Sequence, residues 1–151
     1  MRLTLQTDYA LRVLTFVGAA AGGRATIQEI ADGFGVSRGH IMKVAYRLGQ
    51  KGYLETVRGK GGGLRLARPP KSIGVGAVVR DMEDLDLVGC LPGREGYCRI
   101  EGCCVLRRAL REAARAFVAA LEPYTLEDLL SPRAQLAKLL RLTEPTVAAP
   151  S

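Results

Sequence analysis

Two short helical segments joined by a glycine-containing turn leave few architectures open to this chain. The first begins at Thr26-Ile27-Gln28-Glu29, a capping box in which the threonine and glutamate side chains satisfy each other's backbone donors. Residues 33–37 form the turn, and Ser37 can cap the second segment, which ends at Gly49 or Gly52. The apolar positions of the second segment recur at helical spacing, and they are Ile41, Val44, Ala45 and Leu48. These proportions predict a helix-turn-helix.

A further helix precedes this pair, and a hairpin follows it. Thr7 can cap a helix over residues 8–21, which a pair of glycines ends. Residues 53–57 are rich in strand formers, residues 58–63 reverse the chain, and residues 64–66 return as an alternating strand. Three helices followed by a basic hairpin predict a mainly α fold, the winged helix-turn-helix.

Residues 105–121 show the strongest helical pattern in the chain. One stripe of this segment is apolar and rich in alanine: Leu106, Ala109, Leu110, Ala113, Ala114, Phe117 and Leu121. Nothing in its own module is available to cover the stripe, and its small residues permit close approach of a second helix. We therefore predict a long C-terminal dimerisation helix.

The chain divides into four parts along its length. We expect residues 1–70 to form the winged helix-turn-helix module, which Pro69-Pro70 closes, and residues 71–104 to hold a connecting helix over 74–82 and a cysteine loop. Residues 105–142 contain the long helix, a short turn capped by Thr125 and a helix that begins at Pro132. We expect the tail, residues 143–151, to be disordered.

Charge is spread unevenly over the sequence. The formal net charge is +7; residues 1–80 carry 13 basic and 4 acidic side chains, whereas residues 81–151 carry 9 and 11. A basic N-terminal half indicates a polyanion partner, most simply nucleic acid. The N-terminus lacks the apolar region of a signal peptide, and no apolar run is long enough to cross a bilayer, so we expect a cytoplasmic protein without a membrane partner.

The predicted second helix of the pair and the hairpin supply the groups that nucleic acid would meet. The N-terminal residues of a recognition helix reach base edges or phosphates in the major groove, and basic side chains on a wing can enter the minor groove. The hairpin turn matches neither the GxxxxGK[ST] nor the GxGxxG phosphate loop, which favours the wing. The candidate DNA-binding residues are Gln28, Ser37, Arg38, His40, Lys43, Arg58, Lys60 and Gly61.

All four cysteines of the chain lie within residues 90–104, a segment that one proline and three glycines keep irregular. Four cysteines could form two disulfides in three ways, but a reducing compartment favours metal or redox thiols. The spacings lack the paired CxxC pattern of structural zinc sites and suit an iron–sulfur cluster at the start of a helix, whose N-terminus offsets negative charge. We expect at most one of the adjacent Cys103 and Cys104 to join a single centre, so three cysteines are usable. A cluster that needs four ligands is then one ligand short.

The sequence resembles the iron–sulfur winged-helix repressors of the NsrR and IscR family, and most closely the nitric-oxide-sensing NsrR branch. The resemblance runs from residue 1 to about residue 130. It rests on four motifs and on three cysteines before a long helix; the motifs are residues 7–12, 26–31, 37–43 and 57–63.

This resemblance implies a set of cluster ligands. The third cysteine of the family lies directly before the long helix, which selects Cys104 beside Cys90 and Cys98 and makes Cys103 the extra thiol. IscR-like proteins complete the cluster with a histidine, but Arg107 stands at that position here. NsrR-like proteins can use an aspartate from the other subunit, and Asp8 matches it; Asp8 could also be an ordinary acid at a helix start.

The function implied is that of a homodimeric repressor that binds a palindromic double-stranded DNA operator and carries a four-iron cluster that senses nitric oxide. A sensor of iron or redox state with a two-iron cluster and a zinc-binding regulator remain as alternatives. A redox enzyme is disfavoured, because the chain has a single histidine and no CxxC pair.

Overall fold

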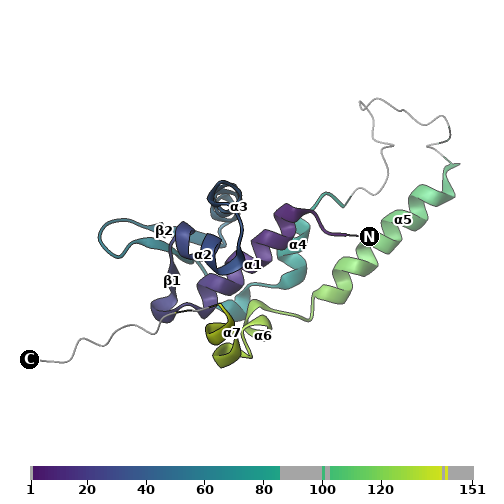
Figure 1. Cartoon of the computed structure of the whole chain (residues 1–151). Helices are drawn as coiled ribbons and strands as arrows, with labels where there is room; N and C mark the ends of the chain where they lie inside the picture. The colour runs from purple at the N-terminus through teal and green to yellow at the C-terminus, as the bar shows by residue number, and fades with distance from the viewer. Residues whose placement is uncertain (1, 86–99, 101–102, 141, 143–151) are drawn as a thin grey trace, which may run out of the picture.

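The computed structural model describes residues 2–85, 100, 103–140 and 142 of the chain. Predictions about Cys90, Cys98 and the 143–151 tail therefore lie outside the described residues. The described part is mainly helical, with one small antiparallel sheet, and it has the winged helix-turn-helix architecture that the sequence predicts (Figure 1). No helix in this part is both long and apolar enough to cross a membrane.

The first helix, α1 (Leu5–Ala19), lies at the centre of the core, and its start corrects the predicted cap. Thr4, not Thr7, is the N-cap, and its side chain accepts a hydrogen bond from the Thr7 backbone N–H. Thr7 is fully buried within the helix. Thr4 takes the cap because its N–H and hydroxyl donate to Glu83 at 3.0 and 3.1 Å, a contact between residues 79 positions apart.

The helix pair forms as predicted. Thr26 and Glu29 make the capping box at the start of α2 (Ile27–Phe34). Gly35 ends α2 in the left-handed conformation, which favours glycine. Ser37 is the N-cap of α3 (Arg38–Gln50), whose buried residues are the four apolar ones predicted.

The sheet has one strand more than the predicted hairpin. Strands β2 (Leu54–Val57) and β3 (Gly63–Leu66) pair antiparallel, and β1 (Arg24–Ala25) adds to the other edge of β3 after a single 3-10 turn, η1 (Ala21–Gly23). Two residues are too few for an alternating pattern, so β1 could not be recognised from the sequence.

The elements after the hairpin pack onto the same core. A 3-10 turn, η2 (Pro70–Ser72), leads to α4 (Val75–Met82). Two short helices follow the long helix in the described residues: α6 (Leu126–Leu129), which Thr125 caps as predicted, and α7 (Arg133–Leu139). Buried residues of these segments join the cluster around α1: Ile73, Val78, Met82, Leu126 and Leu130. The last helix, predicted to run from Pro132 to about residue 142, ends at Leu139.

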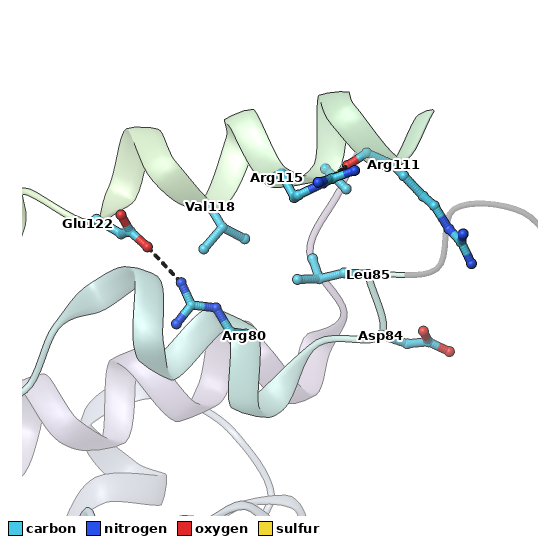
Figure 2. Close-up of a pocket in the computed structure, with 8 residues that line it drawn as sticks. Arg80, Asp84, Leu85, Arg111, Arg115, Val118 and Glu122 are labelled. Carbon is cyan, nitrogen blue, oxygen red and sulfur yellow. Dashed lines mark hydrogen bonds and ion pairs between the residues drawn. The ribbon is translucent and has the colours of Figure 1, made fainter. Parts of the chain in front are cut away.

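The long helix α5 (Val105–Leu121) projects from the body of the molecule (Figure 1). It packs against α4, where Val118 points into the space between the two helices (Figure 2). Arg80 of α4 and Glu122 form an ion pair of 2.7 Å across this contact. Ala114 and Val118 of α5 are buried. In the single chain the predicted apolar stripe is exposed at Leu106, Ala109 and Ala113 and half-buried at Leu110, Phe117 and Leu121.

Candidate DNA interface and metal centre

The polar face of α3 carries the predicted recognition residues. Arg38, His40 and Lys43 are exposed on it. Ser37 and His40 are joined by a hydrogen bond of 2.8 Å between Oγ and Nδ1, and the His40 ring lies 6.1 Å from the ring of Tyr9. His40 is therefore directed toward α1, whereas Lys43 faces outward.

Gln28 lies in the first turn of α2. It is exposed, and its side-chain amide donates to Asp32 at 2.7 Å along the surface of the same helix. This hydrogen bond orients the amide without burying it, which leaves Gln28 accessible to a backbone phosphate.

The hairpin between β2 and β3 forms the wing. Arg58 and Lys60 are exposed in its turn, and Gly61 has a φ of 73°, a left-handed conformation that favours glycine. A groove separates the wing from α3, and residues of both elements line it, among them Val57, Gly59 and Gly62 of the wing. None of the predicted DNA-binding residues is among the residues that line this groove, although Arg58, Lys60 and Gly61 lie in the same turn as Gly59 and Gly62.

Met42 and Tyr46 were not predicted as interface residues, yet both line the α3 side of this groove. Their exposed fractions are 55% and 68%. The signal was available in the sequence, because positions 42 and 46 fall outside the phase of the buried residues 41, 44, 45 and 48.

Side chains from α1 and α4 fix the position of α3 and of the strand that follows it. Arg47 of α3 donates to the Gln6 side chain of α1. The Tyr53 hydroxyl donates to Asp81 of α4 at 2.7 Å. Burial, with this hydrogen bond to a carboxylate, raises the pKa of Tyr53 to about 12.

Cys104 occupies the N-cap of α5. Its Sγ accepts a hydrogen bond from the Arg107 backbone N–H at 3.4 Å, and the residue is half-buried. The sulfur thus lies at the end of α5 where the helix dipole favours negative charge.

Cys103 differs from its neighbour in both exposure and partner. It is exposed, and its Sγ donates to the backbone oxygen of Ile100 at 3.5 Å rather than accepting from the helix N-terminus. The two thiols open onto one hollow, which four arginines also line: Arg107, Arg108, Arg111 and Arg115. A hollow of this charge suits a thiolate-ligated centre with net negative charge.

Asp8 lies in the first turn of α1, away from this hollow in the single chain. Both of its carboxylate oxygens contact Arg12, at 2.8 and 3.1 Å. The Asp8 side chain is 38% exposed, so a second subunit could reach it. Among the described residues, which include neither Cys90 nor Cys98, no three His, Cys, Asp or Glu side chains gather into a metal-binding group.

Comparison with known families decides the class of protein. Residues 3–132 match the family model of Rrf2, described as an iron-dependent transcriptional regulator. The chain belongs to the Rrf2 family. The prediction of a DNA-binding transcriptional regulator rather than an enzyme is thereby confirmed.

Within the Rrf2 family the chain is an NsrR-type regulator. It is 45% identical over 146 residues to the HTH-type transcriptional regulator NsrR of Bacillus subtilis, a match that covers 95% of this chain and 100% of the relative. It is 48% identical to NsrR of Geobacillus kaustophilus, over 93% of this chain and 97% of that protein.

Solved structures of the Rrf2 fold agree with the architecture described above. CymR, the global cysteine regulator of B. subtilis, has a TM-score of 0.67 at 22% identity, over 87% of this chain and 98% of that one. IscR of T. potens has a TM-score of 0.63 at 24% identity, over 87% and 88%. At these identities the likeness establishes the fold alone.

Proposed function

We propose that this Rrf2 protein is a homodimeric repressor whose affinity for a palindromic DNA operator depends on an iron–sulfur cluster in each subunit. The observation that carries the proposal is the position of Cys104. Its sulfur meets the N-terminus of α5 in a hollow lined by arginines, which offsets the negative charge of a thiolate-ligated cluster. The similarity to NsrR regulators supports an iron–sulfur cofactor. Nitric oxide is proposed as the signal because the sequence motifs resemble the nitric-oxide-sensing branch of the family.

The proposed ligands are Cys90, Cys98 and Cys104 of one subunit and Asp8 of the partner subunit, around a four-iron cluster. When bound, the cluster supplies iron that reacts with nitric oxide. Arg12 holds the Asp8 carboxylate through two contacts and orients it at the surface of α1. Because Gln6 in the same turn of α1 contacts Arg47 of α3, a shift of this turn would move the recognition helix.

The uncovered face of α5 supports the homodimer. Leu106 is 63% exposed and Ala109 and Ala113 are exposed, although all three lie on one apolar side of the helix. Packing of this face against its copy would bury the stripe and hold two recognition helices at a fixed separation, as half-sites about one DNA turn apart require.

The adjacent cysteines offer a matched pair of variants that test the metal centre. We expect Cys104→Ser to lose the cluster and Cys103→Ser to keep it, because only the Cys104 sulfur faces the N-terminus of α5. Iron, sulfide and zinc would be measured in protein purified without oxygen, together with its visible spectrum. Equal iron in the two variants would contradict the assignment of Cys104.

The same measurements distinguish the alternatives. A two-iron spectrum would favour a sensor of iron or redox state on the same scaffold. A colourless protein that contains zinc and no sulfide would indicate a zinc site in place of the cluster.

A further inference from the structure

The outer face of α3 carries two large apolar side chains that the fold does not use. Met42 and Tyr46 lie one helical turn apart, with exposed fractions of 55% and 68%. The opposite side of α3 already supplies the core with four buried residues. The Tyr46 hydroxyl accepts a local hydrogen bond from the Gln50 side-chain amide at 3.0 Å.

These two side chains lie within the basic surface that would meet DNA. Lys43 neighbours them on the exposed face of α3, and Arg58 and Lys60 stand in the wing across the groove. A surface bordered by positive charge favours a polyanion over an apolar peptide or a second copy of this basic module.

The chemistry of the major groove identifies what an apolar patch could read there. Base edges in this groove present hydrogen-bond donors and acceptors, and the one apolar group among them is the C5-methyl of thymine. Met42 and the Tyr46 ring are suited to pack on that methyl. Hydrogen-bond reading of guanine or adenine would need Arg, Lys, Asn or Gln at these positions.

We infer that Met42 and Tyr46 form a thymine-reading surface, which contacts the C5-methyl groups of thymines in the operator half-site that faces α3. This inference rests on the operator binding of the proposed function and adds a base preference to it. It requires neither a particular cluster type nor a particular signal.

Replacement of thymine by deoxyuridine tests the inference, because uracil lacks only the methyl group. A duplex would first be selected from a random library with the full-length, cluster-loaded protein at fixed salt, and each thymine would then be replaced in turn. We expect one or more positions at which the wild-type affinity falls about fourfold, the amount that corresponds to burial of one methyl-sized group.

Variants of α3 connect that loss to its residues. Tyr46→Ala and Met42→Ala should each weaken binding to the thymine duplex and remove the penalty at one sensitive position. Tyr46→Phe, which keeps the ring, should retain the penalty. Arg58→Ala should weaken thymine and uracil duplexes equally, because the wing is expected in the minor groove, where neither duplex carries a methyl.

Three results would overturn the inference. One is a wild-type affinity that is indifferent to uracil at every position. The second is a penalty that persists unchanged in both alanine variants. The third is an alanine variant that changes the oligomeric state and leaves duplex affinity intact, which would make the patch a protein contact. Failure to select any duplex would instead remove the proposed function, and this inference with it.

Discussion

A Cβ atom at Gly62 in the wing would overlap the backbone oxygen of Val57, the last residue of β2. The hairpin can close only with glycine there, because the obstacle is backbone and cannot rotate away. Gly49 in α3 is different, since its Cβ would meet only the Leu54 oxygen at 3.8 Å, an ordinary contact.

These two glycines give opposite predictions for one substitution. Gly62→Ala should destabilise the protein by about 1–3 kcal/mol and lower its affinity for DNA, because the hairpin must shift. Gly49→Ala should stabilise it by about 0.5–1 kcal/mol, because alanine suits a helix better. Denaturant unfolding of both variants measures the difference, and equal changes in stability would contradict this account of the wing.

Single residues also show what sequence could predict. The side chains of Thr26 and Ser37 each accept a hydrogen bond from the backbone N–H three positions later, so their roles as N-caps were predictable and are confirmed. The local pattern predicts Thr7 as the N-cap of α1, whereas Thr4 holds that position. The contact of Thr4 with Glu83, remote in the sequence, decides between them. Cys90 and Cys98 lie outside the described residues, so their role as ligands stays a prediction.

At the scale of elements, α5 shows how far periodicity reaches. The pattern predicts the bounds of the helix because its apolar residues recur over 17 residues. It does not say whether the stripe packs within the chain or against another chain, since both arrangements need the same residues. In the single chain Leu106, Ala109 and Ala113 of the stripe are exposed, and the buried residues of α5 are Ala114 and Val118.

Two alanines of α5 test the dimer. We expect Ala113→Glu to weaken dimerisation at least tenfold, because it places a charge at the centre of the exposed apolar face. Ala119→Glu makes the same change on the charged side of the helix and should leave the dimer intact. Sedimentation over a range of concentrations measures both. The dimer interface would lie elsewhere if Ala113→Glu had no effect.

The hydrogen bond between Tyr53, which directly precedes β2, and Asp81 of α4 makes part of the stability depend on pH. The pKa of Tyr53 is raised in the folded protein from its ordinary value of 10.0 to about 12. The stability linked to the protonated hydroxyl is therefore fully present below pH 10 and is lost as the pH rises toward 12. We expect Tyr53→Phe to cost about 1.5–3 kcal/mol at neutral pH, the usual worth of a hydrogen bond to a carboxylate. Thermal or denaturant unfolding between pH 7 and 11 measures the difference in stability between the wild type and Tyr53→Phe, which should shrink near pH 11. A difference that stays constant over this range would contradict the role of the Tyr53 hydroxyl.

For the whole molecule, the question is how a metal centre near α5 could influence α3. In one chain, the N-terminal turn of α1 contacts α3 through Gln6 and Tyr9 and contacts the end of α4 through Thr4. Asp8 lies in this turn. A ligand bond from Asp8 to the partner's cluster would therefore act on the recognition helix through existing contacts.

Asp8→Ala tests this connection. Its exposed ion pair with Arg12 contributes only about 0.3–0.5 kcal/mol, so stability should hardly change. The operator affinity of the cluster-loaded protein should fall about fivefold or more, the lower end of typical coupling between two sites. Glu127→Ala removes another exposed first-turn acid, in α6, and should leave operator binding unchanged. Equal behaviour of the two variants would make Asp8 an ordinary helix-start acid.

The most direct measurement is an oxygen-free titration of the loaded protein with nitric oxide, in which cluster absorbance and operator binding are followed in the same samples. We predict that operator affinity falls in step with the absorbance change and that protein stripped of iron binds as weakly as the fully reacted form. Full operator affinity after the cluster absorbance has disappeared would contradict the control of DNA binding by the cluster.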